Sequence, residues 1–229
     1  MSQLIWLSDT HDLEWFPPVC EALKDPDGLL AAGGGLSTKR LLAAYKRGIF
    51  PWYNAGQPVL WWSPDPRSVL LPGDFRRSRS LAKSLRNRGY TTRLDSAFNE
   101  VLAACAAPRA TGPGTWITPE MAAAYGELHA LGHAHSVETW RNGELVGGLY
   151  GLCLGRVFFG ESMFSRATDA SKVALARLVD ECLKRGIALI DCQVDSPHVA
   201  SLGSRNLPRA QFLKLLSQHI DVASVWPHK

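Results

Sequence analysis

The sequence lacks any apolar run of the roughly 20 residues that a membrane-spanning helix needs. It also lacks a basic, apolar leader segment at its start, so we expect a cytoplasmic protein. Cysteine is scarce. The chain has five cysteines, none in a CxxC pair, and an odd count argues against a disulfide framework. Four of them lie in apolar helical or strand patterns, which predicts reduced thiols in the core.

Acidic residues are absent between Arg76 and Arg93, a segment that contains seven basic residues. The rest of the chain carries 18 basic and 21 acidic residues, so this segment holds the whole positive surplus of a chain whose net charge is +4. Residues 75–88 have the pattern of a short amphipathic helix with leucines facing the core. Its basic face is either a solvated surface or a stripe that follows phosphates. The residues on that face are Arg76, Arg79, Lys83 and Arg86.

The chain divides by composition. Residues 1–65 are rich in Pro, Gly and Trp, contain one helix capped by Ser37, and are predicted to form a small N-terminal domain. From residue 95 the pattern turns to helices and strands, with a loop at 112–114 and a type I′ hairpin at Asn142-Gly143. We therefore predict that residues 66–229 form an α+β domain with a mixed sheet opened by a long middle strand.

The stretch 189–194 reads as a buried strand that carries two polar residues, Asp191 and Gln193. Side chains alternate along a strand, so both are expected on one side, about 7 Å apart. Buried polar groups need partners, so they either satisfy each other and a neighbour or await a substrate. Glu161 lies in another apolar strand pattern and needs a partner for the same reason. Cys192 is a candidate nucleophile, but alternation turns it to the other side.

Two further groups allow a structural and a functional interpretation. His129, His133 and His135 could hold a metal ion, but the intervening Gly132 should end the helix there, which favours structural histidines. Three tryptophans between residues 52 and 62 form either a small aromatic core or a surface that packs an apolar substrate or bases.

Nine short strings occur along almost the whole chain: RGIFPWY (47–53), LWWSPDPR (60–67), GTWIT (114–118), LGHAHSVE (131–138), ELVGGLYG (144–151), FFGESMFS (158–165), ASK (170–172), LIDCQV (189–194) and ASLG (200–203). In this order they resemble the leucyl/phenylalanyl-tRNA–protein transferase family. The resemblance implies a small N-terminal domain followed by a GNAT-like acyltransferase domain. It implies no metal and no cofactor, because the aminoacyl ester is already activated.

The function implied by the resemblance is aminoacyl transfer. An enzyme of this family moves Leu or Phe, and Met more weakly, from aminoacyl-tRNA to the N-terminal Arg or Lys of an acceptor protein. The product is marked for degradation by the N-end rule. We expect a monomer that contacts no membrane. The basic helix matches the segment that holds the tRNA acceptor stem.

The resemblance also assigns site residues. Asp191 and Gln193 match the catalytic pair, and Glu161 matches a position expected to hold the terminal adenosine or the acceptor amine. One hypothesis has Asp191 act through Gln193 to orient and deprotonate the amine, and another gives proton transfer to the terminal ribose hydroxyl. The positions that match the aminoacyl pocket are Trp52, Trp116, Leu149, Phe158, Met163, Leu175 and Ile190.

Two other classes remain to be considered. The basic helix and the tryptophans are also compatible with a non-catalytic RNA-binding module. The fold alone is compatible with a coenzyme-A-dependent acetyltransferase, but residues 165–172 lack the glycines of a pyrophosphate loop.

Overall fold

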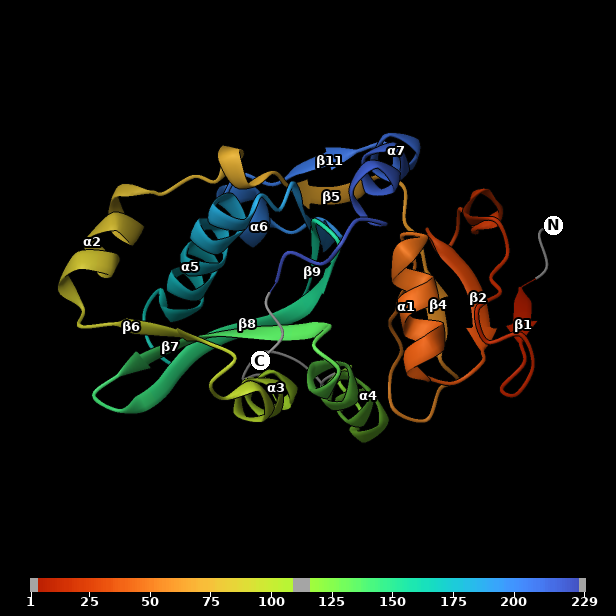
Figure 1. The fold of residues 1–229 in the computed structure, drawn as a ribbon, viewed down its shortest axis with the longest axis horizontal. Coiled ribbons are helices and arrows are strands. Elements are labelled where there is room, and N and C mark those ends of the chain that lie inside the picture. Colours follow the sequence, from red (N-terminus) through yellow and green to blue (C-terminus); the bar gives the residue numbers. More distant parts are fainter. Residues whose placement is uncertain (1–3, 109–115, 227–229) are drawn as a thin grey trace.

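The computed structural model describes residues 4–108 and 116–226, and the loop predicted at 112–114 lies outside them. The described strands form two sheets (Figure 1). The smaller sheet has the order β1-β2-β4-β3, and its strands are β1 (Ile5–Leu7), β2 (Leu29–Gly33), β3 (Phe50–Pro51) and β4 (Leu60–Trp62). The larger has the order β11-β5-β10-β9-β8-β7-β6. Its strands are β5 (Arg67–Leu70), β6 (Thr91–Leu94), β7 (Ala134–Arg141), β8 (Glu144–Leu154), β9 (Val157–Ser165), β10 (Leu189–Gln193) and β11 (Arg205–Leu207).

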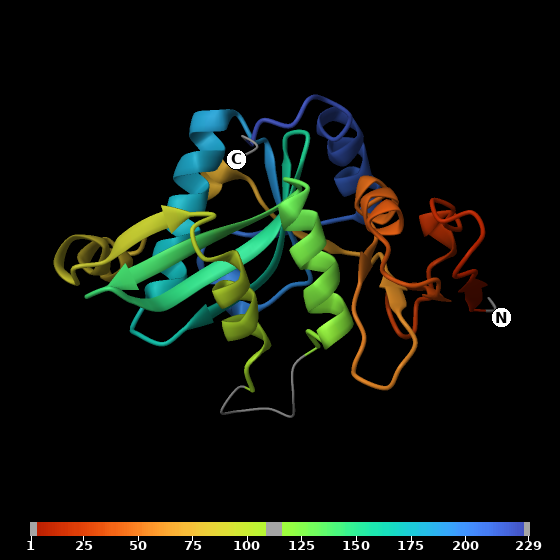
Figure 2. The ribbon, with the colours of Figure 1, turned by 60° about the horizontal axis from the view of Figure 1, so that its bottom comes forward.

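Helices cover both faces of the larger sheet. α5 packs on one face and α3 and α4 on the other, as Figure 2 shows. Because both faces are covered, β8 is buried along almost its whole length. The helical segments are η1 (Val19–Glu21), α1 (Thr38–Lys46), η2 (Pro72–Asp74), α2 (Arg79–Asn87), α3 (Phe98–Ala106), α4 (Pro119–Ala130), α5 (Ala170–Arg185), α6 (Pro197–Ser201) and α7 (Arg209–His219).

The mixed sheet confirms the predicted α+β class. In the larger sheet β9 and β10 run parallel, and the other described pairings are antiparallel. No helix in the described ranges is long and apolar enough to cross a membrane.

Local signals in the sequence produce several of these boundaries. The Ser37 side chain accepts a hydrogen bond from the backbone N–H of Arg40, and Thr118 does the same for Met121, so both helices begin at side-chain caps. Asn142 and Gly143 have φ values of 53° and 81°, as a type I′ turn requires. The Ser37 cap and the hairpin predicted from the sequence are confirmed.

The predicted basic helix was too long. α2 begins at Arg79 with Ser78 as its N-cap, so Arg76 lies before the helix and not on its basic face. The backbone N–H of Arg76 donates to the carbonyl of Leu202 instead. The capping serine fixes the start of the helix, and the spacing of the basic residues alone does not reveal this boundary.

Several short elements were not predicted from the sequence, including four in the predicted α+β domain. β5, β6, β11 and α6 have three to five residues each, too few to show a periodicity. Three of them are strands that pair with segments distant in the chain, for example β5 with β10.

Candidate active site

A cavity opens where two parallel strands separate. β9 and β10 pair from Val157 and Leu189 to Phe159 and Asp191, and their described pairing ends there. Between the separating ends lies a cavity of about 600 Å³. Its wall also includes Phe50, Pro51 and Trp52 from the smaller sheet and the chain next to it.

All seven residues predicted to form the aminoacyl pocket line this one cavity. They are Trp52, Trp116, Leu149, Phe158, Met163, Leu175 and Ile190. They come from six separate segments of the chain, and the fold brings them together.

Of the three neighbouring tryptophans, one belongs to the aromatic core and another lies at a surface that can contact a ligand. Trp61 is fully buried, and its Nε1 donates to the carbonyl of Gly33 over 2.8 Å, so it belongs to the core. Trp52 is 47% exposed, lines the cavity, and lies against Trp62 with ring centroids 5.7 Å apart. One tryptophan is therefore structural, and another is available to a ligand.

Glu161 projects from an irregularity in β9. Tyr150 pairs with Ser162 and Gly151 pairs with Gly160, so Glu161 is the extra residue of a β-bulge. Gly151 makes the bulge possible, because a Cβ there would lie 2.1 Å from the backbone oxygen of Phe159.

Three donors hold the Glu161 carboxylate at the cavity wall. The Tyr45 hydroxyl donates to Oε1 over 2.7 Å, and the Tyr125 hydroxyl donates to Oε2 over 2.9 Å. The side-chain amide of Gln193 donates to Oε1 over 3.0 Å. The two tyrosine hydroxyls also contact each other.

Burial is the main influence on the charge of Glu161. It raises the pKa to about 7, although the hydrogen bonds from Tyr45, Tyr125 and Gln193 work in the opposite direction. The negative charge of Asp191 adds to the increase. Burial also raises the pKa values of both tyrosines well above the ordinary value, so they stay protonated donors at neutral pH.

Asp191 lies behind the cavity wall, in a buried ion pair. The Nε of Arg67 donates to Oδ1 over 2.9 Å and Nη2 donates to Oδ2 over 2.7 Å, and neither side chain is exposed. Arg67 also donates to the carbonyl of Gly48 over 3.0 Å. Its guanidinium lies 4.7 Å from the ring centres of Phe50 and Phe212.

Gln193 departs from the strand pattern. Its φ is 65°, in the left-handed region, and the pairing register of β10 shifts between Asp191 and Gln193. The backbone N–H of Gln193 donates to Oδ1 of Asp191 over 2.9 Å. The carboxylate therefore holds the backbone of Gln193, while the side chain of Gln193 reaches Glu161 in the cavity.

Arg67, Tyr45 and Tyr125 were not predicted from the sequence as site residues. Arg67 stands at the end of the string LWWSPDPR, and Tyr45 lies in the helix that Ser37 was predicted to cap. The available signal was the predicted burial of Asp191, because a buried carboxylate requires a cationic or hydrogen-bonding partner. The sequence does not say which residue that partner is.

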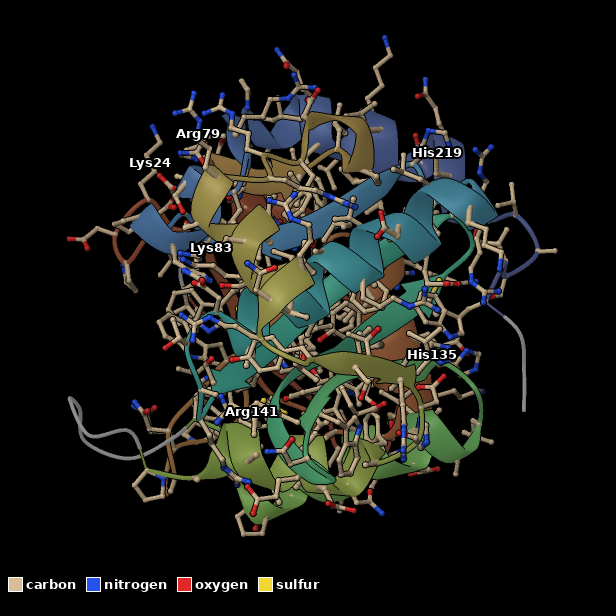
Figure 3. All side chains as sticks on the ribbon, turned by 90° about the vertical axis from the view of Figure 1, so that its left-hand side faces the viewer. Lys24, Arg79, Lys83, His135, Arg141 and His219 are labelled. Carbon is tan, nitrogen blue, oxygen red and sulfur yellow. The ribbon has the colours of Figure 1, made fainter. Side chains whose placement is uncertain are left out.

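The basic residues of α2 face away from the cavity-forming core. Arg79, Lys83 and Arg86 are exposed, and the ion pairs of the described chain include none of them. Figure 3 shows Arg79 and Lys83 along the same outer edge of α2. Arg77, by contrast, pairs with Asp180 of α5.

His129 and His135 make contacts within the protein, and Cys192 lies at the cavity wall. Nδ1 of His129 lies 2.8 Å from the carbonyl oxygen of Ala134, and Nδ1 of His135 lies 3.0 Å from Oδ2 of Asp95. Cys192 is partly buried at the cavity wall, and burial raises its pKa to about 12. A thiol with that pKa is neutral at physiological pH and a weak nucleophile.

The chain matches one protein family over most of its length. The family profile described as leucyl/phenylalanyl-tRNA protein transferase matches residues 69–217, and the profile of its N-terminal domain matches residues 34–65. A leucyl/phenylalanyl-tRNA–protein transferase from Thiobacillus denitrificans is 59% identical over 91% of this chain and 91% of its own length. The protein of the same name from Stutzerimonas stutzeri is 56% identical over 95% of this chain and 96% of its own length.

Solved structures resemble the chain more distantly. A GCN5-related N-acetyltransferase from Kribbella flavida has a TM-score of 0.39 and 14% identity, covering 73% of this chain and 59% of that chain. A ribosomal-protein-alanine N-acetyltransferase from Brucella melitensis biovar Abortus 2308 has a TM-score of 0.35 and 16% identity, covering 59% of this chain and 94% of that chain.

Proposed function

The chain belongs to the leucyl/phenylalanyl-tRNA–protein transferase family and is an aminoacyltransferase, and from this we propose that its cavity holds the amino acid carried by the tRNA. The observation that carries the proposal is a cavity of about 600 Å³ whose wall is mostly apolar and includes a polar corner, formed by Glu161 and Gln193. The apolar wall suits the side chain of Leu or Phe, and of Met more weakly. Such a wall separates side chains that differ by one methylene by only about 1–3 kcal/mol, so one cavity can accept several of them.

The polar corner is proposed to receive the amine of the acceptor protein. Glu161 and Gln193 offer a carboxylate and a carboxamide next to each other at the cavity wall. Both carboxylate oxygens of Asp191 are engaged by Arg67, so Asp191 acts on the substrates only through Gln193. This arrangement favours the orienting part of the Asp191 hypothesis over direct deprotonation by Asp191.

Positioning accounts for much of the expected rate. Holding the ester and the amine in a reactive geometry can lower a barrier by about 7–11 kcal/mol without any base. The rigid ion pair of Arg67 and Asp191 supports the backbone of Gln193 in the conformation that such positioning requires.

The exposed basic face of α2 is proposed to hold the acceptor stem of the tRNA. Arg79, Lys83 and Arg86 form the stripe on the helix, and Arg76 extends it from the preceding loop. Phosphate contacts of this kind position an RNA without reading its sequence. Selection among tRNAs then comes mainly from the attached amino acid.

The physiological role follows the family resemblance. We propose acceptors that begin with Arg or Lys, products that enter N-end-rule degradation, and a cytoplasmic monomer. We also propose a division of the chain at residue 65, since the strands of the smaller sheet precede it and those of the larger sheet follow it.

A transfer assay tests the function. Purified protein is incubated with radiolabelled Leu-tRNA and a peptide that begins with Arg, beside a matched peptide that begins with Gly. We expect label on the Arg peptide only. If neither peptide is labelled while the charged tRNA stays intact, the transfer function is wrong, and the basic helix and Trp52 point to an RNA-binding module instead.

A further inference from the structure

The environment of Glu161 has a property that aminoacyl binding does not require. Three contacts close a ring among three groups: the hydroxyls of Tyr45 and Tyr125 touch each other, Tyr45 reaches Oε1, and Tyr125 reaches Oε2. The ring joins α1, β9 and α4. A count of its protons shows what it can do, because each tyrosine hydroxyl has only one proton to donate.

The ring has room for one more proton when Glu161 is ionised. In that state the two hydroxyl protons both point to the carboxylate, one to each oxygen, and the contact between the hydroxyls contains no proton. A proton on Oε2 completes the ring: Glu161 then donates to Tyr125, Tyr125 donates to Tyr45, and Tyr45 donates to Oε1. Gln193 donates to Oε1 in both states. The carboxylate can therefore gain a proton without movement of any side chain.

Building on the proposed function, we propose that Glu161 accepts the proton that the α-ammonium group of the acceptor protein must lose, and that Tyr45 and Tyr125 are positioning residues that keep Glu161 able to accept it. The proton moves from nitrogen to the Glu161 carboxylate. The nitrogen lone pair then forms a bond to the ester carbonyl carbon, and the bond from that carbon to the ribose oxygen breaks. The ribose oxygen leaves with a second proton from the attacking nitrogen, and Glu161 later releases its proton to solvent.

The charge balance around Glu161 suits this step. Burial raises its pKa and the three donors lower it, with a result of about 7. An α-amino group has a reference pKa of about 7.7–8.0, so the two groups are matched near neutral pH. Donors to an ionised group form stronger hydrogen bonds than donors to a neutral one, so Tyr45 and Tyr125 favour the ionised form.

Other titratable groups face Glu161 from the surrounding elements. Burial and the negative charge of Glu161 both raise the pKa of Tyr150 in β8. The Tyr150 hydroxyl has no hydrogen-bond partner among the described residues. Asp191 of β10 is a like charge, but Arg67 of β5 is paired with it. Neither Tyr150 nor Asp191 donates a hydrogen bond to Glu161 among the described contacts. Tyr45 and Tyr125 are therefore the titratable residues whose substitution removes a hydrogen bond to Glu161.

The first test follows the titration of Glu161 directly. The full-length protein is labelled with [¹³C-carboxyl]glutamate, and the resonance missing from Glu161→Gln is assigned to Glu161. We expect a wild-type midpoint near pH 7. In Tyr45→Phe and in Tyr125→Phe one donor to the ionised form is lost, so the midpoint should rise by about one pH unit.

Tyr53→Phe is the matched control. Tyr53 is also a buried tyrosine, but its hydroxyl lies 3.2 Å from Oγ1 of Thr118 and makes no described contact with Glu161. We expect its midpoint to equal that of the wild type. A wild-type midpoint near the reference value for glutamate, about 4.3, or unshifted midpoints in both tyrosine variants would overturn the proposal.

The second test follows transfer. With both substrates saturating, the acid limb of the kcat profile should move to higher pH in Tyr45→Phe and Tyr125→Phe. Their rates should fall about tenfold near pH 6 but stay within about twofold of wild type at pH 9, since a raised pKa removes the ionised base only below it. A uniform loss at every pH would indicate a structural role and overturn the proposal. If the wild-type protein transfers nothing at any pH, the proposed function fails and the proton role with it; normal transfer with unshifted midpoints sinks the proton role alone.

Discussion

Arg67 and Asp191 show how a single pair of residues supports the site. Both side chains are fully buried, and the pair is joined by two hydrogen bonds. A buried ion pair adds little net stability compared with apolar residues, because both charges lose their water. Its value here is conformational, since the same carboxylate holds Gln193 in a left-handed conformation that a non-glycine residue rarely adopts.

Removal of one partner should therefore be costly. We expect Arg67→Met to lower the free energy of unfolding by about 3–5 kcal/mol, because it leaves the Asp191 charge buried without a partner. The double variant Arg67→Met/Asp191→Leu should recover much of this loss. Urea denaturation of both variants measures the effect.

The matched control is Arg77→Met. Arg77 forms an ion pair with Asp180, but both side chains are about half exposed, so the loss should be below about 1 kcal/mol. If Arg67→Met costs no more than Arg77→Met, removal of Arg67 does not leave the Asp191 charge buried without a partner, and the prediction is wrong.

The size of the cavity gives a second prediction for single residues. Leu175 lies on α5 and lines the cavity, so Leu175→Phe should narrow it. We expect kcat/KM with Phe-tRNA to fall at least about tenfold more than kcat/KM with Leu-tRNA, because the larger side chain loses its room first. Leu183→Phe is the control, since Leu183 is on the same helix but 57% exposed. Equal losses for the two charged tRNAs would show that Leu175 does not limit the side chain.

At the scale of elements, the bulge in β9 and the end of β10 create the site. The bulge turns Glu161 toward Tyr45 and Tyr125, and the loss of pairing after Asp191 opens the cavity. Bulges often re-aim a side chain next to an active site. Two local irregularities in one sheet thus produce both the apolar wall and the polar corner.

The helix α2 supplies the prediction at this scale. We expect Arg79→Ala/Lys83→Ala to weaken tRNA binding and to reduce the slope of log K against log salt by about one to two, because up to two phosphate contacts disappear. Binding titrations at several salt concentrations measure the slope.

Lys39→Ala/Lys46→Ala is the matched control for α2. These two lysines lie on α1 and pair with Glu14 and Asp221. Their removal changes the net charge by the same amount, yet it should leave the salt slope unchanged. An equal reduction in both double variants would mean that α2 has no special part in binding tRNA.

At the scale of the molecule, the two sheets are joined by one continuous apolar core. One cluster of buried side chains runs from Leu30, Tyr45 and Trp61 near the smaller sheet to Tyr150 and Phe159 in the larger one. The Arg67 side chain and the Glu161 ring also connect the two parts. The cavity wall takes residues from both sides of this junction, so the site depends on their relative position.

We therefore expect the whole chain to unfold in one cooperative transition. Differential scanning calorimetry should give a single peak whose calorimetric enthalpy equals the van't Hoff enthalpy. Two resolved transitions would contradict this expectation and show that residues 1–65 fold independently of the rest.

Much of this protein was determined by the sequence alone, and for local reasons. Ser37, Thr118 and Asn142-Gly143 act within a few residues of the boundaries they set. The pocket residues could be named because apolar side chains at matching family positions keep their place when a fold is kept, and the structure does gather them around one cavity.

Only the tertiary structure decided how the buried charges are satisfied. Tyr45 meets Glu161 across 116 positions of the sequence, and Arg67 meets Asp191 across 124. A carboxylate in an apolar strand pattern predicts that a hydrogen-bond donor is needed, but no local pattern identifies the distant residue that provides it. The identity of the partner depends on how the helices and strands pack. The roles that we propose for Glu161 and Asp191 depend on the same packing.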